Sequence, residues 1–234
     1  MRRKVGRLVL AFALGVLLFS ASAKTSLAES NPLGRTAAVM ERVRRISDTL
    51  KSSEYSHVTR VNEAEGSYVF DCSGFVAWVL RRAATGAHLS VVSRAKDRRP
   101  LARDYYWEIA RTRANAARGW ARVDRVMDAR PGDVIAWLKP PEVRSTNTGH
   151  VAFIVESPEP SRVVEGGYLV RIADASRYYH QNDEREELGR SGFGIGTILI
   201  VADPVTHAPV AYGWFGDRSA WVLSAQIAIG RPTR

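Results

Sequence analysis

A single cysteine, Cys72, occurs among the 234 residues of the chain. The chain therefore cannot form a disulfide within itself, and a hydrophobic core has to hold its fold together. Hydrophobic residues make up 45% of the sequence, which is enough to build such a core. We expect one domain of ordinary size that needs no covalent cross-link.

The N-terminus has the order of a secretory signal peptide. The basic stretch MRRKVGR precedes the apolar run LVLAFALGVLLF, and small residues follow. We interpret residues 1–28 as this signal, with cleavage after Ala23 or Ala28. An uncleaved anchor is the disfavoured alternative, because the run is shorter than the roughly 20 residues that cross a bilayer. The sequence thus predicts an exported protein, periplasmic or extracellular, without a stable membrane anchor after cleavage.

Removal of the signal peptide also changes the charge. Residues 1–28 hold five basic and no acidic residues, so the net charge falls from +10 to +5. Half of the apparent basicity therefore belongs to the targeting signal and says nothing about a partner.

Cys72 opens a predicted amphipathic helix. Apolar residues recur after it at helical spacing, and the run ends at Thr85 and Gly86. Asp71 is a natural N-cap, which places Cys72 in the first turn. The free N–H groups and the dipole of that turn favour an anion, so they would stabilise a thiolate or an oxyanion. Cys72 is therefore a candidate nucleophile, and the alternative is a small buried hydrophobic residue without chemistry.

His150 is the best candidate for the base that such a thiol needs. It stands directly after a loop, at the first position of the β-type run HVAFIVE. Three of the other four histidines, His57, His88 and His207, lie in polar or turn-like surroundings. His150 is thus predicted to begin a buried strand.

Asp174 is predicted to lie beside His150. The run GYLVRIADAS follows after a loop rich in proline and glycine, and the two runs predict an antiparallel hairpin. A symmetric register brings His150 next to Asp174 at the end of one apolar face, against which we expect the Cys72 helix to pack. Cys72, His150 and Asp174 then form a nucleophile, a base and an orienting group. The alternative is a strand-edge histidine and a turn aspartate, with Ser176 or His180 as other polar groups that could orient His150.

Four motifs carry a resemblance to a known family. FDCSGFVAWVL, RPGDVIAW, TGHVAFIVE and IADAS occur in this order between Tyr55 and Ala175. They resemble the successive motifs of the NlpC-type cell-wall peptidases, a family of the papain-like cysteine peptidase superfamily. The resemblance implies a helix packed on an antiparallel sheet, with Cys72 as nucleophile and His150 as base. The third polar residue of the family, often a histidine, falls at Asp174.

The resemblance also implies residues that bind the peptide substrate. Tyr55, Asp71 and Ser73 match positions with this role, and the Ser73 N–H would contribute to the oxyanion hole. The sequence departs from the family pattern in that Tyr55 is not followed by a Gly-Gly pair. The segment before RPGD and the loop of the hairpin are also long. These departures predict a remodelled rim around the cleft.

The segment 94–125 is strongly basic. Ten Arg or Lys residues face four Asp or Glu there, and two tyrosines and two tryptophans are interleaved with them. The favoured interpretation is a solvated arginine-rich helical face whose aromatic residues join the core. A surface that faces the cell wall is the alternative. Nucleic acid is not an expected partner, because exported proteins rarely meet it.

The predicted fold class is α+β, of the papain-like/NlpC-type, with the nucleophile-bearing helix packed on an antiparallel sheet of about six strands. Helical spacing over residues 37–51 predicts an N-terminal helical segment at 29–54. The peptidase domain would then span 55–234, with a basic insertion around 94–125.

The predicted function is that of an exported cysteine peptidase or amidase, which hydrolyses amide bonds of peptidoglycan stem peptides through a thioester. Two alternatives stay open: a thioester-forming acyltransferase of the same fold, and a non-catalytic cell-wall binding module. The expected partner is peptidoglycan or muropeptides. No cofactor or metal motif occurs, and we interpret His180 and Asp183 as loop residues, with His180 a candidate for the active-site rim.

Overall fold

The computed structural model describes residues 32–96, 98–112 and 119–234. The predicted signal peptide at 1–28 lies outside these residues, and so does a part of the basic insertion. None of the helices within the described part is long and apolar enough to cross a membrane.

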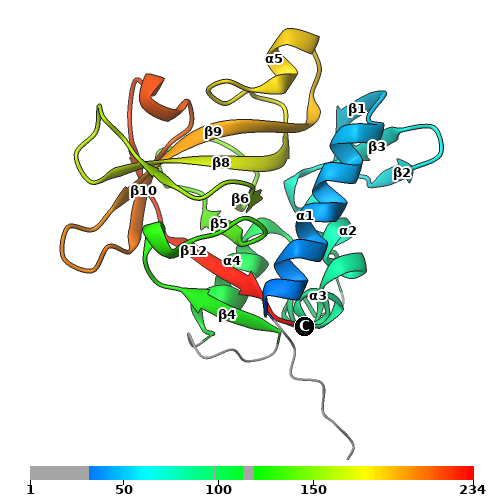
Figure 1. Ribbon diagram of the computed structural model, residues 1–234, viewed down its shortest axis with the longest axis horizontal. Helices are drawn as coiled ribbons and strands as arrows, with labels where there is room; N and C mark the ends of the chain where they lie inside the picture. Colours follow the sequence, from blue (N-terminus) through cyan, green and yellow to red (C-terminus); the bar gives the residue numbers. More distant parts are fainter. Residues whose placement is uncertain (1–31, 97, 113–118) are drawn as a thin grey trace, which may run out of the picture.

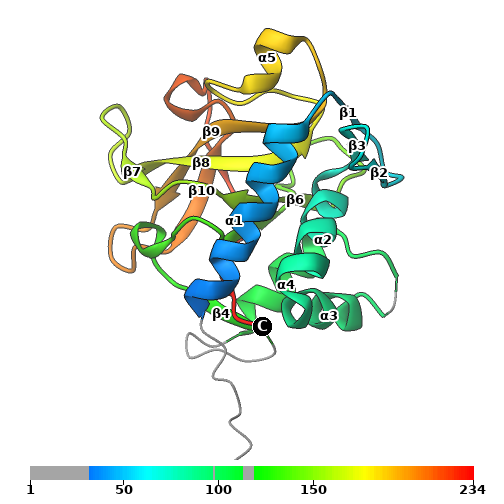
Figure 2. The same cartoon turned by 45° about the vertical axis from the view of Figure 1, so that its right-hand side comes forward.

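Five α-helices form in the described residues, and four of them gather beside the main sheet. They are α1 (Pro32–Thr49), α2 (Cys72–Ala83), α3 (Thr85–Arg94), α4 (Ala102–Ala110) and the short α5 (Glu184–Leu188). Figures 1 and 2 show α2, α3 and α4 grouped together, with α1 alongside α2. The helix predicted to begin at Cys72 is thus confirmed.

The main sheet has nine strands and is antiparallel (Figure 1). Its strands are β4 (Trp120–Val123), β5 (Val134–Leu138), β6 (Gly149–Ile154), β7 (Glu159–Pro160), β8 (Gly167–Ser176), β9 (Gly192–Ala202), β10 (Pro209–Gly213), β11 (Leu223–Ser224) and β12 (Ile227–Pro232). They follow the order β11-β10-β9-β8-β6-β5-β12-β4, and β7 pairs with β8. This is more than the predicted six or so, because strands as short as β4, β7 and β11 show no periodic pattern.

A second, small sheet precedes α2. It contains β1 (Ser52–Tyr55), β2 (Arg60–Asn62) and β3 (Ser67–Phe70), in the order β1-β3-β2, with β1 and β3 parallel. The strand β1 spans the predicted boundary between residues 54 and 55, so the helical part of the predicted 29–54 segment ends at Thr49. β3 leads directly into Asp71 and so fixes where α2 begins.

The helix α2 packs on the opposite face of the sheet from the one predicted. Val151 and Phe153 of β6 join the core cluster of α2, and the Phe153 ring lies 5.5 Å from that of Phe75. Ala152 and Ile154 belong to a separate cluster on the other face. The prediction that α2 packs against the face that carries His150 is therefore wrong, since Ala152 and Ile154 share that face with it. The sequence could not decide this, because both faces of the strand are apolar.

The helix α1 shares the core of α2. Val39, Val43 and Ile46, the residues that give α1 its apolar stripe, are all buried in the same cluster. The helix therefore closes the outer side of the α2 layer and packs against α2 and β12.

The basic segment contributes both core and surface. Tyr105 of α4 and Trp120 of β4 are completely buried, as expected for aromatic residues that join the core. Trp107, by contrast, is 39% exposed. Tyr106 is partly buried and packs against the same core, so the described part of this segment agrees with the favoured interpretation for three of its four aromatic residues.

Candidate active site

Cys72 lies in the first turn of α2, where the cap is built as the sequence predicts. Asp71 is extended, with φ −91° and ψ 179°, and its Oδ1 accepts a hydrogen bond of 2.7 Å from the Gly74 N–H. Cys72 itself is 8% exposed. Its sulfur therefore stands at the end of the helix where backbone N–H groups and the dipole favour negative charge.

Asp71 also receives side chains from two distant segments. Arg99 donates from Nη1 to Oδ1 at 2.7 Å and from Nη2 to Oδ2 at 2.9 Å, while His57 Nδ1 lies 2.9 Å from Oδ2. Ser73 Oγ adds a donor at 3.0 Å to Oδ1. Burial would raise the pKa of Asp71, but the hydrogen bonds from Arg99, His57 and Gly74 outweigh it and lower that pKa. Asp71 thus ties two distant chain segments to the end of α2.

Tyr55 lies next to this cluster. Its ring packs edge-on against His57 at 5.6 Å, and the Arg177 guanidinium stands 5.3 Å from the ring centre. Burial, together with the negative charges of Cys72 and Asp71, raises the pKa of Tyr55. The three residues that the resemblance assigns to substrate binding, Tyr55, Asp71 and Ser73, are thus close to Cys72, and their role stays a prediction.

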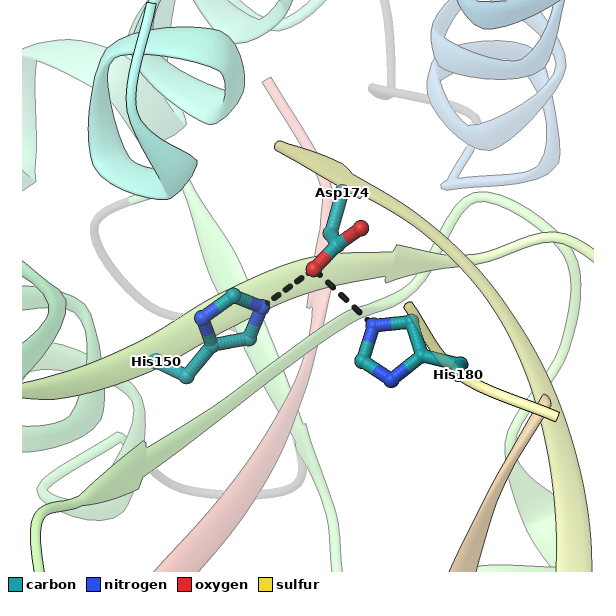
Figure 3. Close-up of side chains that lie close together, drawn as sticks. All are labelled: His150, Asp174 and His180. Atoms are coloured by element: carbon teal, nitrogen blue, oxygen red, sulfur yellow. Dashed lines mark hydrogen bonds and ion pairs between the residues drawn. The ribbon is translucent and has the colours of Figure 1, made fainter. Parts of the chain in front are cut away.

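His150 stands at the start of β6 beside Asp174, as predicted. Its Nε2 lies 2.6 Å from Asp174 Oδ2 (Figure 3). When the register that pairs Phe153 with Ala173 is extended along the two strands, Asp174 lies diagonal to His150 and not directly opposite it. Gly149, with φ +146°, precedes it, because a Cβ there would collide with the carbonyl of Trp137 on β5.

The imidazole of His150 also interacts with the Cys72 thiol. Because Asp174 takes Nε2, Nδ1 is the nitrogen left for the sulfur. Burial alone would lower the pKa of His150, but the negative charge of Cys72 and the Asp174 carboxylate outweigh it and raise that pKa to about 9. The His150 imidazole is therefore expected to be protonated at neutral pH, as an imidazolium that interacts with Cys72.

Asp174 is completely buried and has two further cationic or polar partners that the sequence did not predict. His180 Nε2 lies 3.1 Å from the same Oδ2, and Arg185 Nη2 lies 2.9 Å from Oδ1. Burial would raise the pKa of Asp174, but Arg185, His180 and His150 hold it well below its usual range. His180 is only 1% exposed, so the suggestion that it lines the rim is wrong.

His150, Asp174 and His180 form a group whose possible ligand atoms lie within 4.8 Å of one another, a spacing that could suit a metal ion. The donor set does not favour one. Asp174 Oδ2 is at hydrogen-bond distance from both imidazoles, and its Oδ1 already faces the Arg185 guanidinium. A divalent cation would have to break these contacts and lie near a buried positive charge. We therefore interpret the group as a hydrogen-bonded cluster.

Residues 62–167 match the family model of the CHAP domain, a family of amidase and peptidase domains in the papain-like cysteine peptidase group. The match covers a little under half of the chain. It includes Cys72 and His150 and ends before Asp174. The predicted papain-like group is thus supported, through the CHAP model and not through the NlpC-type one.

A curated relative matches over a similar length. An uncharacterized protein of Acanthamoeba polyphaga mimivirus is 35% identical over 92 residues, which is 39% of this chain and 38% of the relative. The chain thus spans less than two fifths of the length of that relative. No solved structure matches the chain significantly.

Proposed function

We propose that the chain is a cysteine peptidase or amidase that hydrolyses amide bonds in the stem peptides of peptidoglycan. The observation that carries the proposal is that Cys72, at the start of α2, interacts with His150, which is hydrogen-bonded to Asp174. The CHAP match supports a hydrolase that acts on peptidoglycan. The NlpC-type motifs of the sequence support the same substrate class.

The first half of the reaction forms a thioester. The Cys72 thiolate attacks the carbonyl carbon of the amide, and the oxygen takes up the negative charge beside the N–H groups of the first turn of α2. The C–N bond then breaks, and the His150 imidazolium gives its proton to the leaving amine. The acyl group of the substrate remains bound to sulfur.

The second half releases the acid. Neutral His150 takes a proton from water, the oxygen of that water attacks the thioester carbon, and the C–S bond breaks. The proton stays on His150, so the thiolate and the imidazolium are restored. Asp174 holds the imidazole in the orientation that both transfers need.

We also propose that the protein acts outside the cytoplasm. Residues 1–28 have the composition of a signal peptide, and peptidoglycan lies beyond the inner membrane. Expression in a bacterium, followed by fractionation and mass determination of the N-terminus, tests this proposal. An uncleaved protein in the cytoplasm would contradict it.

The reaction is tested on intact sacculi. The purified protein should release shortened muropeptides, measured by mass spectrometry, and Cys72→Ala should release none. The matched control is His207→Asn, in an exposed turn far along the chain, which should act like the wild type. Equal release by the wild type and Cys72→Ala would overturn the proposal.

The same assay separates the two alternatives. An acyltransferase should give products joined to an added amine acceptor, whereas a hydrolase gives free acids even when the acceptor is present. A non-catalytic binding module should co-sediment with sacculi and release nothing. The masses of the released fragments also identify which amide bond is cleaved.

A further inference from the structure

The carboxylate of Asp174 is held from three directions. Oδ2 faces His150 Nε2 at 2.6 Å and His180 Nε2 at 3.1 Å, and Oδ1 faces Arg185 Nη2 at 2.9 Å. The side chains of Asp174, His180 and Arg185 are all fully buried, so water cannot replace any of these partners. Each contact therefore restricts the rotation of the carboxylate.

His180 is itself fixed at both nitrogens and at its backbone. Its Nδ1 lies 3.1 Å from the Trp214 carbonyl oxygen, and its backbone N–H donates to Asp183 Oδ2 at 2.8 Å. The indole ring of Trp214 lies 4.3 Å from the imidazole. Because the Asp174 carboxylate can only accept, the hydrogen bond to it requires a hydrogen on His180 Nε2.

Arg185 connects Asp174 to a second buried carboxylate. Its Nη2 lies 2.6 Å from Asp183 Oδ2, its Nε lies 2.9 Å from Asp183 Oδ1, and its Nη1 donates to the Gly192 carbonyl at 2.8 Å. Asp183 in turn caps α5 through the Arg185 N–H. The guanidinium is thus held rigidly while it holds Asp174.

The strand β9 leaves the room that these two side chains occupy. A Cβ at Gly194 would lie 2.6 Å from Arg185 Cγ, and a Cβ at Gly196 would lie 2.8 Å from His180 Cβ. Both distances are too short for real atoms, so larger residues at these positions would displace Arg185 or His180. Glycines at alternate positions of β9 therefore make room for side chains of the segment that follows β8.

We propose that His180 is a positioning residue of the active site, which acts through Asp174 and is supported by Arg185. His180 donates to the same carboxylate oxygen that meets His150 (Figure 3). That oxygen therefore stays aimed at the His150 imidazole, which interacts with Cys72. This role rests on the proposed function, and it lies in a segment that the CHAP match does not reach.

Two substitutions of His180 separate its two hydrogen bonds. The amide nitrogen of glutamine can take the place of Nε2, so His180→Gln keeps the donor toward Asp174. The amide nitrogen of asparagine can take the place of Nδ1, so His180→Asn keeps the bond to the Trp214 carbonyl and loses the one to Asp174. We expect turnover to fall about tenfold or more in His180→Asn, and by less than about threefold in His180→Gln, since one hydrogen bond to a charged group is lost in the former alone.

The titration of His150 provides a reading that does not depend on substrate. We expect its midpoint, followed by NMR of the imidazole C–H groups in the intact protein, to move to lower pH in His180→Asn, because a loosely held carboxylate stabilises the imidazolium less. The midpoint should stay near that of the wild type in His180→Gln and in the control His207→Asn. A purely structural role of His180 would lower the melting temperature of both variants without this difference.

The outcomes are distinct. Equal turnover and equal midpoints in His180→Asn and His180→Gln would overturn the proposal. If both variants fail to fold, Gly196→Ala, which keeps His180 and crowds its Cβ, should lower the midpoint, and an unchanged midpoint would contradict the proposal. If the wild type leaves sacculi intact, the proposed function fails, and the midpoints still decide whether His180 positions Asp174.

Discussion

Two carboxylates flank the candidate nucleophile, and they are held in opposite ways. Asp71 is tied to its neighbours by partners that reach solvent, because the side chains of His57 and Arg99 are 59% and 37% exposed. Asp174 is completely buried, and so are His180 and Arg185 around it. Both carboxylates are therefore buried, but the partners of Asp71 reach solvent and those of Asp174 do not.

The difference shows which of the two carboxylate clusters holds its geometry more strictly. Asp71 is itself buried, but its partners Arg99 and His57 reach solvent, so water can take the place of a lost partner and lower the cost of losing it. A buried charge that loses its partner keeps its full desolvation cost, so the Asp174 cluster holds one geometry or is destabilised. The base is thus fixed more strictly than the surroundings of the helix end.

Removal of the central cation on each side gives the largest expected contrast. Arg185→Met leaves Asp174 and Asp183 without their shared partner, and we expect the free energy of unfolding to fall by about 3–5 kcal/mol. Arg99→Met should cost less, about 1–2 kcal/mol, because Asp71 keeps its hydrogen bonds from Gly74 and Ser73 and water reaches the vacated side. Urea unfolding followed by tryptophan fluorescence measures both, and similar losses would contradict the comparison.

Neutralisation of Asp174 should have the next largest effect, on turnover. Asp174→Asn removes the charge that stabilises the His150 imidazolium, and we expect turnover to fall by about a hundredfold or more. The matched control is Asp133→Asn, since Asp133 is equally buried and pairs with Arg231 away from the site. The control should lose stability but keep the turnover of its folded molecules. A mild loss in Asp174→Asn would remove Asp174 from the mechanism.

The pH dependence should follow His150. Its pKa is raised above the ordinary value of about 6.5 to about 9, so the imidazolium persists through neutral pH. We expect kcat/KM to fall about tenfold per pH unit above about 9, because the proton donor to the leaving amine is lost. The stability that comes from this raised pKa is fully present below about pH 6.5 and is lost as the pH rises through 9. A rate that climbs steadily beyond pH 10 would contradict this assignment.

The smallest expected effect belongs to His57. His57→Ala removes the most exposed partner of Asp71, while Arg99 and the Gly74 N–H remain in place. We expect the free energy of unfolding to change by less than about 1 kcal/mol. Thermal unfolding measures it, and a loss as large as that of Arg185→Met would show that the Asp71 cluster is as rigid as the buried one.

The sequence predicted what is encoded locally. Asp71 caps α2 and Cys72 enters its first turn because a short polar residue before an apolar helical run has few other roles. The proximity of His150 to Asp174 could also be predicted from the sequence, because a hairpin brings the start of one run next to the end of the following run. The α+β class and the antiparallel sheet rest on the same periodic signals.

What the sequence could not predict depends on contacts between distant segments. Arg99 lies among nine other basic residues of the 94–125 segment, and nothing in the pattern marks it as the partner of Asp71. His180 and Arg185 stand in a polar stretch that reads as a loop, although both are buried. A signal was present in the glycines of β9, where Gly194 and Gly196 make room for them. The face that α2 covers was also undetermined, since β6 is apolar on both sides.

The lone thiol at the start of α2 also makes the protein dependent on its redox surroundings. A sulfenic acid formed on Cys72 would find no second cysteine within these 234 residues, so it could not be rescued as an internal disulfide. Repair would then need a small thiol supplied from outside, and without one oxidation proceeds to sulfinic and sulfonic acids that do not revert. The supply of reductant, and not only the supply of substrate, would set how many copies stay competent.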